Sequence, residues 1–193
     1  MTEQPHHQFN ESDFQHMLDS MFAAENEELL AKMREQIKHD EQLAELSKAI
    51  GIDDEKLVQS LMDMGITAHS MAALTMYPMV CVAYADGVLN MEERDLIMKM
   101  AGEWNMKPGD AGFEVLNHWL VDGPSKDGFA VWKKYIQTVI TQMTPQQIAD
   151  LKVSIMSRSN AVATAVGDVL GRFGNRTNKA EDALLAEIES VFP

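Results

Sequence analysis

The chain has 193 residues, 46% of them hydrophobic, and no apolar run approaches the roughly 18 residues that cross a bilayer, so we expect a soluble globular protein without membrane insertion. Its 16 basic and 30 acidic side chains give a net charge of −14, which repels phosphate groups and argues against nucleic-acid or membrane partners. The opening residues lack a secretion signal and Cys81 has no second cysteine to pair with, which predicts a cytoplasmic protein.

The first predicted element is a long helix that follows a flexible N-terminus of residues 1–11. Ser12 is its candidate N-cap and Gly51 ends it. Apolar residues recur between them at intervals of three or four positions, namely Phe14, Leu18, Met21, Phe22, Leu29, Met33, Ile37, Leu43, Leu46 and Ile50. Such a run exceeds the usual length of a globular helix, about 8–20 residues. Three interpretations are open: an extended arm, a helical hairpin broken near His39-Asp40, or a surface that pairs with another chain.

A short second helix is predicted to complete an N-terminal arm of residues 12–65. It carries Leu57, Val58, Leu61 and Met62, and it ends at Gly65. The stretch that follows, through Ala85, is apolar on nearly all sides, which is typical of a helix inside a core. Pro78 lies in this stretch and is expected to kink the helix or to split it in two.

Five further helices are predicted, and glycine- or proline-containing turns separate them. These turns are Asp86-Gly87, Pro108-Gly109, Asp122-Gly123-Pro124, Thr144-Pro145 and the segment from Gly171 to Gly174. Thr177 or Asn178 is expected to cap the last helix. No alternating apolar pattern of useful length occurs, so the predicted fold class is all-α.

A weak internal repeat relates residues 88–97 to residues 176–185. The two segments match at four positions, with Asn90 on Asn178, Glu93 on Glu181, Leu96 on Leu184 and Ile97 on Leu185. The copies are unequal, because Gly174-Asn175 stands where the first copy has Asp86-Gly87. An Asn-x-x-Glu start is common among helices, so a duplicated unit and chance similarity both remain open.

The stretch from Ala83 to Ile97 joins the end of one helix, the Asp86-Gly87 turn and a new helix that begins with Asn90 and Glu93. It resembles the signature of the TerB-like family, named for tellurite-resistance proteins. The resemblance extends to the tryptophan-containing middle of the chain and to the ending Lys179-Ala-Glu-Asp-Ala-Leu-Leu. It implies a TerB-like helical bundle with two repeated units over residues 66–193, preceded by an added helical arm.

Two roles are open for Asp86 and Glu93. In the first, Asp86 accepts backbone hydrogen bonds in the turn and Glu93 completes a helix cap. In the second they bind a divalent cation, calcium or magnesium, which the resemblance implies because TerB-like proteins are thought to hold a metal on acidic residues at this turn. An EF-hand loop is excluded, since its earlier ligand positions fall on Val82 and Tyr84, which have no carboxylate. No catalytic residue and no other cofactor site is predicted.

We therefore expect a non-enzymatic helical scaffold or adaptor that responds to a cation and that, by the resemblance, takes part in stress or tellurite resistance. Its expected partner is another protein or a second copy of the chain, bound through the N-terminal helix. Two alternatives are a metal-dependent enzyme with Asp and Glu ligands, and a purely structural oligomer assembled through that helix.

Overall fold

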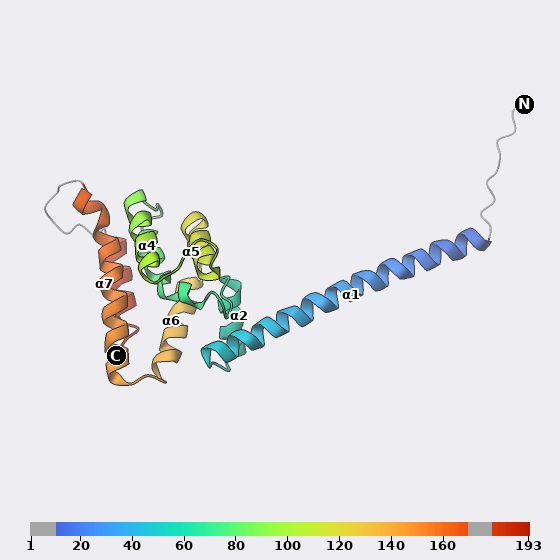
Figure 1. The fold of residues 1–193 in the computed structure, drawn as a ribbon, viewed down its shortest axis with the longest axis horizontal. Helices are drawn as coiled ribbons and strands as arrows, with labels where there is room; N and C mark the ends of the chain where they lie inside the picture. Colours follow the sequence, from blue (N-terminus) through green and yellow to red (C-terminus); the bar gives the residue numbers. More distant parts are fainter. Residues whose placement is uncertain (1–10, 170–178) are drawn as a thin grey trace, which may run out of the picture. The chain divides into compact units, whose positions relative to one another are not determined.

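A computed structural model describes residues 11–169 and 179–193 (Figure 1). Helices make up most of this part of the chain and it contains no strand, which confirms the predicted all-α class. In chain order the elements are α1 (Glu11–Ile50), α2 (Glu55–Asp63), the 3-10 helix η1 (Met71–Thr75), α3 (Tyr77–Ala83), α4 (Met91–Glu103), α5 (Ala111–Asp122), α6 (Gly128–Ile140), α7 (Pro145–Val169) and α8 (Lys179–Glu189). The predictions for residues 1–10, for Gly171 and Gly174, and for a cap at Thr177 or Asn178 lie outside the described residues.

α1 is one uninterrupted helix. It continues through His39 and Asp40, so the hairpin alternative does not form. The reason lies in the backbone, because no glycine or proline occurs between Glu11 and Ile50 and the polar residues at 39–40 interrupt only the apolar stripe. The helix also begins at Glu11, ahead of the predicted cap at Ser12.

The chain divides into two units, Met1–Gln42 and Leu43–Pro193. The compact unit thus begins within α1, and the boundary at residue 65 that the sequence suggested does not coincide with this division. Leu46 is fully buried and α2 packs against α6, so both belong to the core of the second unit. Residues 43–65 are consequently part of that core, not of an arm.

α3 lies at the centre of the compact unit. All seven of its residues are buried, and it contacts α4, α5, α6, α7 and α8. Pro78 occupies the first turn of α3, where a missing backbone N–H is tolerated, so it separates η1 from α3 and kinks neither. Cys81 is buried in this helix, and burial raises the pKa of its thiol to about 12, which makes it an inert core residue.

Two tryptophans, one in α5 and one in α6, donate hydrogen bonds to the backbone of the segment before α3. The indole N–H of Trp119 donates to the carbonyl of Met64, and that of Trp132 donates to the carbonyl of Leu74, both at 3.1 Å. Both rings are buried, so an unpaired indole N–H would be costly. These bonds hold α5 and α6 against the chain between α2 and α3.

Deleting residues 1–42 is expected to leave a folded protein, because the division of the chain falls after Gln42. Deleting residues 1–50 also removes Leu46, and loss of a buried leucine side chain costs about 2–5 kcal/mol. Thermal unfolding followed by circular dichroism should show a cooperative transition for the first truncation and a melting temperature lower by at least several degrees for the second. Equal melting temperatures would place Leu46 outside the core.

Candidate functional site

The predicted site residues Asp86 and Glu93 flank the turn between α3 and α4, and each binds backbone near its own position. Asp86 Oδ1 accepts a hydrogen bond from the Val88 amide at 3.1 Å, across a turn in which Gly87 has φ +92°. Glu93 Oε2 accepts from the backbone N–H of Asn90 at 3.0 Å and from its side-chain Nδ2 at 3.3 Å. Glu93 therefore acts as the acidic residue of a capping box, as its spacing from Asn90 predicts.

Glu93 is nevertheless an unusual capping residue, because its side chain is only 2% exposed. Burial raises the pKa of Glu93 and the two hydrogen bonds from Asn90 oppose that rise, while the negative charges of Glu181 and Asp86 add to it. Glu181 lies in the first turn of α8 and is also buried, with 7% exposed. Two buried carboxyl groups, Glu93 of α4 and Glu181 of α8, thus lie near enough for the charge of one to affect the other.

The sequence repeat contained the signal for this arrangement, because it lays Glu93 on Glu181. Sequence reasoning named only Asp86 and Glu93 as metal ligands and left Glu181 out, since burial of both carboxylates depends on how α8 docks on α3 and α7. Within residues 11–169 and 179–193, no group of three or more His, Cys, Asp or Glu side chains is arranged to hold a metal ion. Cation binding by Asp86 and Glu93 stays a prediction.

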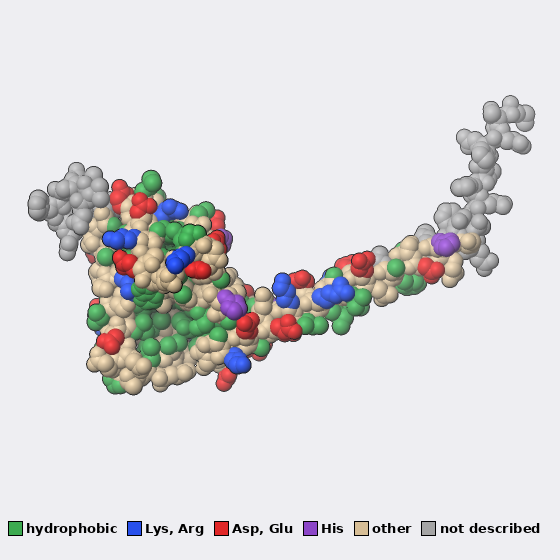
Figure 2. Space-filling view, in the orientation of Figure 1, with side chains coloured by type: hydrophobic (Ala, Val, Ile, Leu, Met, Phe, Trp, Pro, Cys, Tyr) green, Lys and Arg blue, Asp and Glu red, His purple; other side chains and the backbone are tan. Residues whose placement is uncertain are grey.

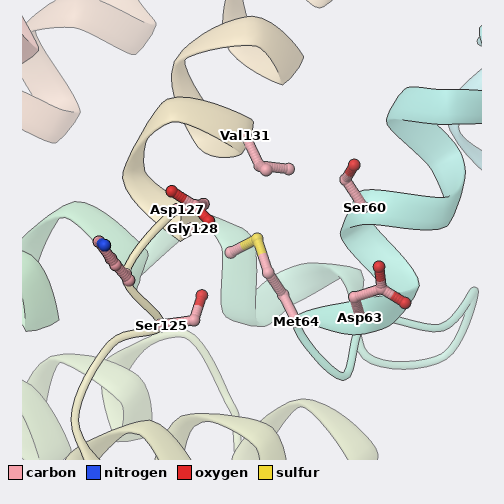
Figure 3. Close-up of a pocket in the computed structure, with 8 residues that line it drawn as sticks. Ser60, Asp63, Met64, Ser125, Asp127, Gly128 and Val131 are labelled. Carbon is pink, nitrogen blue, oxygen red and sulfur yellow. The ribbon is translucent and has the colours of Figure 1, made fainter.

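A hollow of about 300 Å³ lies between α2 and the start of α6 (Figure 3). Its lining residues are Ser60, Asp63, Met64, Ser125, Lys126, Asp127, Gly128 and Val131. On the α2 side the polar groups are engaged within their own helix, because Ser60 Oγ donates to the Lys56 carbonyl and Asp63 accepts from Gln59. The volume is at the lower limit of small-molecule sites.

A row of apolar side chains lies along α1, and Figure 2 shows hydrophobic groups following this helix. We call it the α1 stripe, and its members are Met21, Phe22, Leu29, Leu30, Met33 and Ile37. Each is between 50% and 59% exposed, although five of the six are large aliphatic residues of the kind that proteins normally bury. A row of exposed apolar side chains on a helix is a candidate surface for contact with a protein.

Comparisons of the chain with protein-family models, curated proteins and solved structures find no match. In the part of the chain that the structure describes, no helix is both long enough and apolar enough to cross a membrane. Membership of the TerB-like family accordingly stays a prediction from the sequence resemblance.

Proposed function

We propose that this protein is a helical scaffold or adaptor that acts by binding a protein partner through α1. The observation that carries the proposal is the α1 stripe, whose six apolar residues recur at helical spacing and are all half-exposed. Removing apolar area from water contributes roughly 25 cal/mol per Å², so a partner that covers the stripe gains free energy along its whole length. Apolar anchors three or four residues apart are also the usual means by which an amphipathic helix docks on another surface.

The proposal contains no catalytic step. A metal-dependent enzyme would need an open coordination position next to a substrate-binding group in one cleft. Asp86 and Glu93 each accept hydrogen bonds in their own turn, and the hollow beside α6 is lined by different residues, which supports binding over catalysis. On the sequence resemblance we include TerB-like membership and a part in stress or tellurite resistance in the same proposal. On the single cysteine, Cys81, we include a cytoplasmic location.

We also propose that a divalent cation, calcium or magnesium, stabilises the junction at Asp86 and Glu93. The observation that favours it is the buried Glu93 carboxyl group, which lies in the negative fields of Asp86 and Glu181. A hard cation beside these oxygens would offset both the burial and the repulsion, and oxygen ligands are the ones that calcium and magnesium prefer.

Sedimentation of native extracts from cells that produce the protein tests the scaffold proposal. The wild-type chain is expected in a species well above its own mass of 21.6 kDa, and the variant L29Q/M33Q is expected to lose that species because two apolar anchors of the stripe become polar. A31Q/E35Q is the matched control, since it also introduces two glutamines but on the opposite face of α1. The extracts contain the protein at about 50 μM or more, above the dissociation constant that a contact of this length predicts, and wild-type protein that sediments at its monomer mass at that concentration would refute the proposal.

A further inference from the structure

We propose that the partner of α1 is the α1 helix of a second copy of this chain, paired antiparallel, with the two-fold axis passing between Leu29 and Leu30. This inference rests on the proposed scaffold function and makes it specific. Two properties of α1 carry it, the spacing of the apolar positions and the placement of the charges beside them.

Six positions on one face of α1, five of them apolar and the sixth Asn26, are spaced symmetrically about the middle of the helix, and Met21 of the α1 stripe lies off this face. Phe22, Asn26, Leu29, Leu30, Met33 and Ile37 lie on one face, and successive members are four, three, one, three and four residues apart. An antiparallel pair reverses the order of one helix, so a palindromic spacing brings each position opposite its counterpart. Phe22 then meets Ile37 of the second copy, Asn26 meets Met33, and Leu29 meets Leu30. All six residues are exposed and available for this contact.

The charges beside the stripe match the same register. Glu27 precedes the centre of the stripe and basic residues follow it, with Glu27 and Arg34 on one side of the face and Lys32 on the other. A two-fold axis perpendicular to the helices brings the same side of both faces together. Glu27 therefore comes beside Arg34 of the second copy, while Lys32 forms an ion pair with Glu28 of its own chain at 2.6 Å.

A parallel pair of α1 helices gives a poorer match of opposite charges. It places Glu27 near Lys32 of the second copy, but it leaves Arg34 without an acidic neighbour and lays the acidic segment of one helix along that of the other. The antiparallel register gives Arg34 the carboxylate of Glu27, while Lys32 keeps Glu28 of its own chain. The stretch from Phe22 to Ile37 is about 24 Å long at 1.5 Å per residue, which is short for a stable interface, so we expect dissociation in the micromolar range.

Sedimentation equilibrium of purified full-length protein, over a range up to about 0.2 mM, tests the register through a charge-exchange cycle. Wild type is expected to be a dimer, and E27R and R34E are each expected to weaken it about tenfold, because each places like charges side by side twice per dimer. E27R/R34E restores the pairing and is expected to dimerise as wild type does, with an unchanged composition and net charge. D95R makes the same charge change as E27R at an exposed position of α4 and should leave the dimer intact.

The outcomes separate this inference from the proposed function. In a parallel dimer R34E has no effect and E27R/R34E stays as weak as E27R, so that pattern would overturn the antiparallel register. A purified wild type that is monomeric throughout, together with a large species in cell extracts, would overturn self-pairing and leave the scaffold proposal standing with another protein as partner. Monomers in both measurements would refute both. Circular dichroism of each variant verifies that α1 stays helical.

Discussion

Replacing Gly128 with alanine is expected to destabilise the compact unit by about 2 kcal/mol or more, which lowers its melting temperature by roughly 4–8 °C. A Cβ atom at Gly128 would lie 1.9 Å from the Tyr77 hydroxyl and 2.8 Å from Tyr77 Cζ, both far inside van der Waals contact. Tyr77 has no room to withdraw, because it is fully buried and its ring meets Trp119 edge-on with centroids 4.7 Å apart. The ordinary helical backbone at Gly128 would otherwise accept alanine, so the cost comes from crowding alone.

A double-mutant cycle with Y77F isolates that contact. The Tyr77 hydroxyl is buried with no hydrogen-bond partner of good geometry among the described residues, although Ser125 and Cys81 lie close to it, and burial raises its pKa. Removing it should therefore cost little, and it should recover part of the loss caused by G128A. G102A is the matched control, since a Cβ there meets nothing within 4 Å and the higher helix propensity of alanine predicts a small stabilisation.

Urea unfolding measures the four free energies of unfolding that the cycle needs. If G128A were as stable as wild type, or if Y77F left its loss unchanged, the close approach of α6 to α3 at this point would be wrong. No sequence pattern predicts the contact between Tyr77 and Gly128. Tyr77 and Gly128 are distant in the chain, and their proximity depends on the docking of α6 against α3.

Features that depend on neighbouring residues could be predicted from the sequence, and those that depend on docking could not. The all-α class follows from apolar periodicity and turn residues, and the capping role of Glu93 follows from its spacing to Asn90. The uninterrupted course of α1 was also contained in the sequence, since nothing between Glu11 and Ile50 breaks a helix. The boundary between the two units at Gln42 could not be predicted, because it depends on burial of Leu46 by elements far along the chain.

The candidate site shows the same division. The sequence identifies Asp86 and Glu93, and both lie at the turn with hydrogen bonds that the local geometry dictates. The near-complete burial of Glu93 and the influence of Glu181 arise only when α8 packs on α3 and α7. The internal repeat aligns Glu181 with Glu93, but similar residues at two helix starts do not predict that the two helices pack together.

Calcium or magnesium is expected to raise the melting temperature of the wild-type protein. An ion that binds the folded state alone stabilises it by mass action, by about 2.7 kcal/mol at a concentration one hundred times its dissociation constant, or roughly 5–10 °C for a protein of this size. A background of about 0.15 M NaCl keeps general screening of the −14 charge constant. D86N/E93Q is expected to abolish the rise, because amides offer weaker oxygen ligands and no charge.

Without the ion, the same double variant separates the two roles of these residues. Burial and negative neighbours raise the pKa of Glu93. Its charged form therefore lowers the stability of the folded protein once the pH exceeds the ordinary pKa of a glutamate. This loss of stability is absent when the group is protonated or replaced by glutamine. D86N/E93Q should accordingly be as stable as wild type or slightly more stable at pH 7, since the amide oxygens still accept from Val88 and Asn90. E92Q/D95N removes two exposed charges from the same helix and should preserve the response to the ion. If neither calcium nor magnesium changed the melting temperature of the wild type, and D86N/E93Q were clearly less stable, Asp86 and Glu93 would serve only as caps.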